Sequence, residues 1–157
     1  MKLYLLKMRQ TAKSCGAYIR VNNKTTVNSN TSIGDNVSFN GLQIIGEGEV
    51  FIGSNIHFAP DCIIITQNHN YEGDKLPFDE VNIIKKTTIN DNVWVGQRVT
   101  ILPGVEIGEG AIIQAGSVVV SDIPACAIAG GHPAKVFNHR DKNRYNMLKE
   151  KMSYISR

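Results

Sequence analysis

The chain has 157 residues, of which 42% are hydrophobic, and this size and composition suit a single domain with a solid core. Its formal net charge of +3 is small, and basic residues do not alternate with stacking aromatic residues, so no nucleic-acid partner is expected. The three cysteines, Cys15, Cys62 and Cys126, are an odd number without metal-type spacing, which indicates a reduced, cytoplasmic protein.

Residues 1–16 are predicted to form an N-terminal cap. The segment MKLYLLKMRQTAK mixes apolar and basic residues and is too short and too charged to span a bilayer, so no integral membrane segment is expected. The same mixture leaves a second possibility open, namely that the segment lies on a membrane surface.

Residues 17–138 carry a six-residue repeat that is interrupted once, at residues 66–86. A Val, Ile or Phe begins fourteen of its steps: Val21, Val27, Ile33, Phe39, Ile45, Ile52, Phe58, Ile64, Ile89, Val95, Ile101, Ile107, Ile113 and Val119. This period fits neither an α-helix nor a single strand, and it is typical of a β-solenoid, in which short strands stack on their equivalents in the next coil. An ordinary β-sandwich is disfavoured because its strands do not keep one phase over about a hundred residues.

The fifth position of each step supports the solenoid. Its residues are small or branched and are predicted to point inward beside the first position: Val37, Ile56, Cys62, Val93, Val99, Val105, Ala111, Ser117 and Ile123. Glycine is frequent at the second position, and Asn or Asp fills other corner positions. These residue types tolerate the backbone of a tight corner.

The interruption at residues 66–86, TQNHNYEGDKLPFDEVNIIKK, is predicted to leave the wall as an extruded loop. Long irregular loops in compact domains are usually functional or disordered, and this one carries aromatic residues, a proline, carboxylates and His69. A histidine imidazole can accept a proton near neutral pH, so His69 at the root of the loop is predicted to be a general base. The alternative is a surface histidine without a role.

Other candidate chemistry is weaker. No third histidine has suitable spacing to join His57 and His69, so no metal site is expected. The chain has no glycine-rich phosphate loop, and no histidine is paired with Cys126 for nucleophilic catalysis. Trp94 ends a step in the first coil after the loop, where it could form the wall of a ligand site or a subunit contact.

Residues 139–157 are predicted to form a C-terminal amphipathic helix. Tyr145, Leu148, Met152 and Ile155 recur at helical spacing. This helix would cover the open end of the solenoid or reach a neighbour, and residues 1–157 would then form one domain.

The hexapeptide columns, the extruded loop with its histidine, the stretch INDNVWVGQRVTILPGVEIGEGAIIQAGSVVVSDIP and the ending GGHPAKVF together resemble the hexapeptide-repeat acetyltransferases. The most similar group is the galactoside, maltose, nodulation-factor and capsular-polysaccharide O-acetyltransferases, and the resemblance covers roughly residues 20–138. It implies an all-β, single-domain, left-handed parallel β-helix with an extruded loop and a C-terminal α-helix. It also implies a homotrimer with active sites between subunits, and acetyl-coenzyme A as co-substrate with no permanently bound cofactor.

The resemblance implies roles for individual residues. His69 matches the catalytic histidine, which takes the proton of an acceptor hydroxyl while that hydroxyl attacks the acetyl thioester directly. Trp94 matches the tryptophan beside this site, and Asn40 lies near the substrate-binding asparagine, about one residue out of register. The residues that match the coenzyme-binding positions are Gly96, Gln97, Ala115, Gly116, Ser121 and Lys135. Lys135 would meet a phosphate of the coenzyme.

Three departures from the family pattern leave the acceptor open. Gln114 and Ala115 replace a more usual Gly-Ala pair, His132 stands where Asn or Val is frequent, and the N-terminal region is shorter than in the maltose and galactoside enzymes. The implied function is an acetyl-coenzyme-A-dependent O-acetyltransferase acting on a sugar or polysaccharide precursor. The alternative is an N-acetyltransferase of an amino sugar, or an antibiotic acetyltransferase, on the same scaffold. The missing histidine triad disfavours a carbonic-anhydrase-like or non-enzymatic solenoid.

Overall fold

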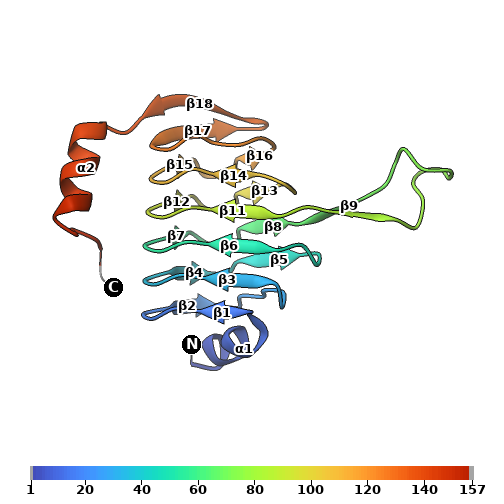
Figure 1. The fold of residues 1–157 in the computed structure, drawn as a ribbon, viewed down its shortest axis with the longest axis horizontal. Helices are drawn as coiled ribbons and strands as arrows, with labels where there is room; N and C mark the ends of the chain where they lie inside the picture. The colour runs from blue at the N-terminus through green and yellow to red at the C-terminus, as the bar shows by residue number, and fades with distance from the viewer. Residues whose placement is uncertain (1, 156–157) are drawn as a thin grey trace.

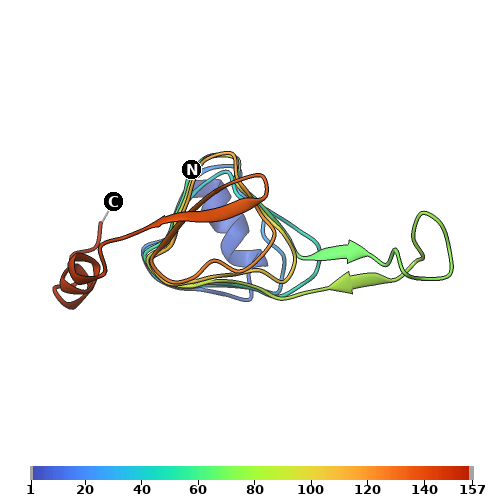
Figure 2. The same cartoon turned by 90° about the horizontal axis from the view of Figure 1, so that it is seen from above.

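The computed structural model of the chain describes residues 2–155 and shows a stack of β-coils with a triangular cross-section (Figures 1 and 2). Most coils contribute one short strand to each of three sheets, which form the walls of a prism. The coils rise in a left-handed sense, against the usual right-handed connection of parallel strands (Figures 1 and 2). The predicted left-handed parallel β-helix is therefore confirmed.

The sheets are called A, B and C in the order in which the chain visits them. Sheet A contains β1 (Ser14–Cys15), β3 (Thr31–Ile33), β6 (Val50–Ile52), β11 (Thr87–Ile89) and β14 (Glu106–Ile107). Sheet B contains β2 (Arg20–Asn23), β4 (Ser38–Asn40), β7 (His57–Phe58), β12 (Trp94–Val95), β15 (Ile112–Ile113), β17 (Ala127–Gly131) and β18 (Ala134–His139). Sheet C contains β5 (Gln43–Ile45), β8 (Ile63–Ile65), β13 (Thr100–Ile101) and β16 (Val118–Val119). The edges between these walls are the A–B, B–C and C–A corners.

Each wall is held by an inward column of apolar side chains, one from each coil. Ile89 pairs in register with Ile107, 18 residues later, so equivalent side chains lie above one another. Phe39 and Phe58 stack in the column of sheet B, with ring centroids 5.4 Å apart. The predicted fifth-position residues are also buried, as expected: Val37, Ile56, Cys62, Val93, Val99, Val105, Ala111, Ser117 and Ile123.

One residue that was predicted to point inward, Ile45, does not. Ile45 is 41% exposed, and Ile44 points inward in its place, in register with Ile64. The B–C corner before it is one residue shorter than in the other coils, because Gly41 turns the chain with a φ of 108° and brings Leu42 to the buried position. The following C–A corner is two residues longer than in the regular coils, and the two changes together produce the one-residue skip between Ile45 and Ile52 in the sequence.

A ladder of asparagine side chains runs up the A–B corner. Asn36 Nδ2 donates to Asn55 Oδ1 at 2.9 Å, and Asn55 Nδ2 donates to Asn92 Oδ1 at 3.1 Å. Asn92 Nδ2 then donates to Glu109 Oε1 at 3.2 Å and to Tyr145 Oη at 2.9 Å. The ladder joins successive coils to one another and to the C-terminal helix.

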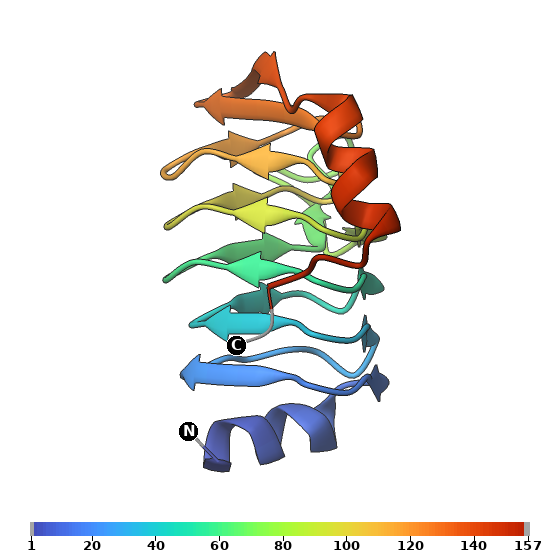
Figure 3. The ribbon, with the colours of Figure 1, turned by 90° about the vertical axis from the view of Figure 1, so that its left-hand side faces the viewer.

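Helix α2 (Lys142–Glu150) runs along the outside of this corner, roughly parallel to the stack (Figure 3). Its N-cap Asp141 accepts a hydrogen bond from the backbone N–H of Arg144 at 2.9 Å. The helix is shorter than predicted: Met152 lies beyond its end, and residues 156–157 lie outside the described residues. The expectation that it covers the open end of the solenoid is wrong, because β18 folds back antiparallel onto β17 and occupies that end.

Helix α1 (Lys2–Thr11) closes the other end of the stack, within the segment predicted to be a cap (Figure 1). Met8 is 2% exposed and belongs to the core, while Leu5 and Ala12 pack against it from the same face of the helix. Met1, the first residue of the predicted cap, lies outside the described residues. Within residues 2–155, neither helix has the length and apolar character needed to cross a membrane.

The interruption of the repeat leaves the prism at the C–A corner and extends far from it (Figures 1 and 2). The prediction of an irregular loop is only partly right, because its base is a regular antiparallel pair of strands, β9 (Gln67–His69) and β10 (Asn82–Ile84). This segment, residues 67–84, is called the extruded hairpin.

Candidate active site

The base of the extruded hairpin is fixed to the wall by Thr66, which is fully buried. Its hydroxyl donates to the carbonyl oxygen of Ile45 at 3.0 Å and accepts the backbone N–H of Gly48, also at 3.0 Å. The side-chain oxygen of Gln67 accepts the N–H of Glu47 at 3.1 Å. Buried groups that satisfy one another are costly to separate, so the hairpin leaves the wall in a defined direction.

His69, the predicted general base, lies on β9 opposite Asn82 and is exposed to solvent. Its imidazole stacks on the ring of Phe78, with centroids 3.9 Å apart and an angle of 6° between the planes. Stacking uses the face of the imidazole, so the ring nitrogens at its edge remain accessible for proton transfer. The hairpin therefore orients His69 through an aromatic contact.

Contacts within the hairpin hold Phe78 in this position. Asn70 Nδ2 donates to Asp79 Oδ2 at 2.8 Å, and the backbone N–H of Asp79 donates to the carbonyl oxygen of Asn70 at 3.1 Å. The other carboxylate oxygen of Asp79 accepts the N–H of Val81 at 2.8 Å. Asp79 thus shapes the turn that follows Phe78.

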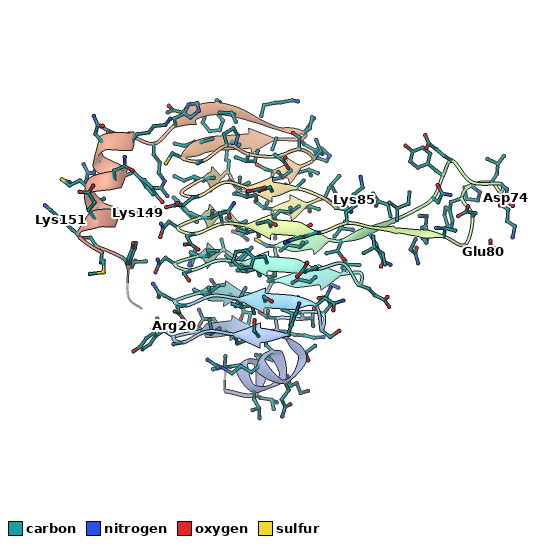
Figure 4. The ribbon with its side chains drawn as sticks, in the orientation of Figure 1. Arg20, Asp74, Glu80, Lys85, Lys149 and Lys151 are labelled. Atoms are coloured by element: carbon teal, nitrogen blue, oxygen red, sulfur yellow. The ribbon has the colours of Figure 1, made fainter. Side chains whose placement is uncertain are left out.

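The tip of the hairpin carries charged groups far from the prism (Figure 4). Lys75 forms an ion pair with Glu80, and the hydrogen bond from Lys75 lowers the pKa of the exposed Glu80 carboxyl below its ordinary value.

Trp94 and Asn40, the predicted substrate-binding residues, belong to sheet B. Trp94 points outward from β12, beside His57 of β7, and is 51% exposed. Asn40 ends β4, where its Nδ2 donates to the carbonyl oxygen of Phe58 at 2.7 Å and its Oδ1 accepts from Asn22 Nδ2 at 2.8 Å. Trp94 is therefore free to contact a ligand face, whereas the amide of Asn40 is already hydrogen-bonded within the wall.

Four predicted coenzyme-binding residues lie together at the B–C corner. Gly96 and Gln97 follow β12, and Ala115 and Gly116 occupy the same corner one coil later, where the N–H of Gly116 donates to the carbonyl oxygen of Gln97 at 2.8 Å. A Cβ atom on Gly96 would lie 2.5 Å from the backbone nitrogen of Ala115, so glycine allows the two coils to approach. Gly116 has a φ of 73° and nothing within 4 Å of where a Cβ would lie, so the outside of this corner is open.

Lys135 lies on β18 and is exposed. The turn that precedes it is attached to the B–C corner, because the N–H of Gly131 donates to Ser117 Oγ at 3.1 Å. Lys135 therefore belongs to the strand pair that follows the open corner at Gly116.

Arg98 is a candidate that sequence reasoning missed. It is exposed at the same corner, directly after Gln97, with a φ of 56°. The sequence did contain one indication, because a basic residue at an exposed corner position does not contribute to the core and is available to bind a ligand. Arg98 supplies a second cation near Gly116, and guanidinium groups are well suited to phosphate.

The remaining candidates lie apart in one copy of the chain. Ser121 is exposed at the C–A corner, His69 lies on the extruded hairpin, and Trp94 lies on the outer face of sheet B. A groove of about 640 Å³ runs along sheet A, and none of the predicted site residues is among those that line it: Phe51, Asn90, Asp91, Glu106, Gly108, Glu109, Asp122, Ile123, Pro124 and Ala125. A single copy thus presents the candidate groups on separate surfaces.

The Cys62 thiol is buried, and the described residues form no metal-binding cluster. Burial raises the pKa of the Cys62 thiol to about 11, so the thiol stays protonated and is a poor nucleophile. Among residues 2–155, no three His, Cys, Asp or Glu side chains are grouped so that they could hold a metal ion.

Comparison with known proteins places these features in context. Residues 86–121 match the family of bacterial transferase hexapeptide proteins (six repeats). Galactoside O-acetyltransferase of Escherichia coli is 38% identical over 122 residues, which cover 74% of this chain and 59% of that protein. A Lysinibacillus sphaericus protein named "Probable macrolide acetyltransferase" is 37% identical over 118 residues, covering 69% of this chain and 62% of that protein.

A solved structure shares the fold. Galactoside acetyltransferase in complex with coenzyme A has a TM-score of 0.72 and 28% identity, over 87% of this chain and 70% of that chain. In sequence, however, this chain spans less than two thirds of the length of the two curated relatives.

Proposed function

Since the chain belongs with the hexapeptide-repeat acetyltransferases in sequence and in fold, we propose that it transfers an acetyl group from acetyl-coenzyme A to a hydroxyl of a sugar or polysaccharide precursor. The observation that carries this proposal is His69, which the hairpin presents at the one long break in the repeat with its ring held against Phe78. The similarity to galactoside O-acetyltransferase favours a sugar hydroxyl as acceptor.

In the proposed reaction, the acceptor oxygen attacks the carbonyl carbon of the acetyl thioester directly. His69 takes the hydroxyl proton as the new C–O bond forms. The C–S bond breaks, and the coenzyme thiolate leaves and takes up a proton. The products are the acetyl ester and free coenzyme A. Trp94 would form an apolar wall beside the acceptor, and Asn40 would stand near it.

The coenzyme is proposed to lie along the B–C corner. The space outside Gly116 is open, so an extended ligand would have access to the corner that Gly96, Gln97, Ala115 and Gly116 form. Lys135 would meet a phosphate group, and Arg98 adds a second positive charge at this corner. Ser121, at the C–A corner, would meet the coenzyme from the other edge of sheet C.

A homotrimer is proposed as the working form. The extruded hairpin projects away from its own prism and exposes Leu76, Val81 and Ile84, which are 95%, 56% and 52% exposed (Figure 2). Large exposed apolar side chains grouped on one segment suit a protein contact. Because His69 and Trp94 lie on separate surfaces of one copy, a neighbouring copy would bring such groups together in a shared site.

A second candidate is an acetyltransferase of an antibiotic or of an amino sugar. The 37% identity to the Lysinibacillus sphaericus protein named "Probable macrolide acetyltransferase" favours an antibiotic as acceptor. The scaffold and the coenzyme corner would be the same, and only the acceptor would differ.

The test is release of free thiol from acetyl-coenzyme A in the presence of sugars, amino sugars and macrolides, with mass analysis of the products. The primary proposal expects release above hydrolysis with at least one sugar and an acetyl ester as product. Transfer only to amino groups or to macrolides would favour the second candidate. Absence of both thiol release and coenzyme binding in calorimetry would refute acetyl transfer altogether.

A further inference from the structure

Basic residues are concentrated at the N-terminal end of the stack. The first 34 residues contain no Asp or Glu, and they contain six cations: Lys2, Lys7, Arg9, Lys13, Arg20 and Lys24. The remaining 123 residues contain 11 Lys or Arg and 14 Asp or Glu, which gives them a formal charge of −3. The small net charge of the chain therefore hides a strongly positive end on a slightly negative body.

Helix α1 turns one face to the core and another to solvent. Met8, Leu5 and Ala12 lie on the inward face. At about 100° per residue, Leu3 and Leu6 fall on the opposite face, where they are 60% and 54% exposed. These two leucines make no contribution to closing the stack.

Basic side chains border the two leucines. Lys7 follows Leu6 on the helix, Lys13 lies just beyond the end of the helix at Thr11, and both lysines are exposed. Lys13 Nζ is 3.6 Å from Glu49 Oε1, and Arg9 Nη2 donates to the carbonyl oxygen of Gly16 at 3.1 Å, so these two cations are partly used within the chain. No ion pair within residues 2–155 involves Lys7.

A groove of about 230 Å³ separates α1 from the first coil. Lys7 and Lys24 line it together with Tyr4 and the hydroxyl-bearing residues Thr11 and Thr25. Lys7 from α1 and Lys24 from the first coil suit a phosphate group. The hydroxyls of Thr11 and Thr25, in contrast, already donate to the carbonyl oxygens of Lys7 and Asn23.

The position of α1 suits contact with a flat surface. The helix lies across the end of the stack of coils (Figure 3). The extruded hairpin and α2 leave from the sides of the prism and do not project beyond α1 (Figure 1). A plane can therefore approach the outer face of α1 without meeting another part of the chain.

We propose that this basic end, formed by α1 and the corner at Lys24, docks onto an anionic phospholipid membrane. Leu3 and Leu6 would enter the boundary between headgroups and acyl chains, and the surrounding cations would meet lipid phosphates, as interfacial amphipathic helices do. A second copy of the same end would oppose like charges, and a nucleic acid would leave the leucines without an apolar partner. The proposal goes beyond acetyl transfer and does not depend on it.

The test is flotation of the purified chain with vesicles of phosphatidylglycerol and phosphatidylcholine, compared with phosphatidylcholine alone. The chain is expected to float with the anionic vesicles only and to be released as salt rises. Leu6→Ser should lower the partition coefficient about tenfold, and Lys7→Glu should lower it at least about fivefold.

Matched controls come from α2, on the side of the stack. Leu148→Ser on α2 and Lys151→Glu at its C-cap make the same changes at exposed positions and should leave partition unchanged; Lys151 is labelled in Figure 4. Thermal melts would show that all four variants fold. The proposal is overturned by absence of binding to anionic vesicles, by equal binding to both vesicle types, by equal losses in the α2 controls, or by binding of single-stranded nucleic acid without binding of vesicles.

Discussion

The stacked coils and the extruded hairpin use similar apolar residues in opposite ways. In the coils, Ile89 and Ile107 are completely buried, because each is covered by its equivalent in the neighbouring coil. In the hairpin, Leu76 and Val81 are 95% and 56% exposed. The side chains of each coil pack on those of the next coil. The hairpin occurs in one coil only, so no equivalent segment above or below covers its side chains. The repeat thus encodes a scaffold, and we expect the extruded hairpin to contact another molecule.

The largest expected effect comes from placing a charge inside a column. Ile107→Asp would bury a carboxylate between Ile89 and Ile123 with no partner, at a cost of several kcal/mol, whereas Ile107→Val should cost only about 1 kcal/mol. Thermal melts should show the Asp variant unfolded or strongly destabilised and the Val variant lower by a few degrees. Equal stability of the two variants would remove the column assignment.

A substitution in the hairpin should lower activity and leave stability unchanged. His69→Ala is expected to lower turnover by about a hundredfold or more, because general base catalysis is lost, while the melting temperature stays near that of the wild type. His139→Ala changes an exposed histidine outside the hairpin and serves as the control. Turnover of the His69 variant close to that of the control would eliminate the assignment.

Lys135 tests the coenzyme side of the proposed site. Lys135→Ala should raise the KM for acetyl-coenzyme A several-fold to about tenfold, in line with one charge-assisted contact on an exposed surface. Turnover at saturation and the KM for the acceptor should change little, because the contact is the same in the ground and transition states. The effect should shrink at high salt, and Lys151→Ala should have none. A defect confined to the acceptor would contradict the role.

The smallest effect is expected where α2 joins the coils. Burial raises the pKa of Glu109, but hydrogen bonds from Lys149, Tyr145 and Asn92 outweigh it and hold this pKa below the ordinary 4.5. The stabilisation is therefore fully present above pH 4.5 and is lost as pH falls through the lowered value. Glu109→Gln should lower the melting temperature at pH 7 by about 1–2 °C, since the pair is partly exposed and screened. A difference that persists unchanged in acid would contradict this account.

Much of the scaffold could be predicted because the repeat reports burial directly. The six-residue period alone is enough to predict that first- and fifth-position residues such as Val95 and Val99 are buried. The corner at Ile44 was mispredicted, because a one-residue deletion in one corner and a two-residue insertion in the next add up to a single one-residue skip in the sequence. The place of α2 was also mispredicted, because it depends on the contact between Tyr145 and the asparagine ladder, which no local pattern reveals.

The candidate site was less predictable than the scaffold. Gly96 and Gly116 became candidates through the resemblance to the acetyltransferases, and the period explains only why their corners stack on one another. The contact of His69 with Phe78, nine residues away, depends on the path of the hairpin and has no periodic signal. Arg98 was missed because an exposed corner residue is indistinguishable from a solvated one until the neighbouring coil is in place.

The most direct test of the division between scaffold and hairpin is a deletion. Residues 68–83 would be replaced by Asn-Gly, which joins the paired residues Gln67 and Ile84 by a two-residue turn. Circular dichroism and thiol release from acetyl-coenzyme A would be measured on the same preparation. The account predicts a β-rich chain that still melts cooperatively and releases no thiol above hydrolysis. A deletion variant that transfers acetyl groups at the wild-type rate, or that has no cooperative melt, would contradict it.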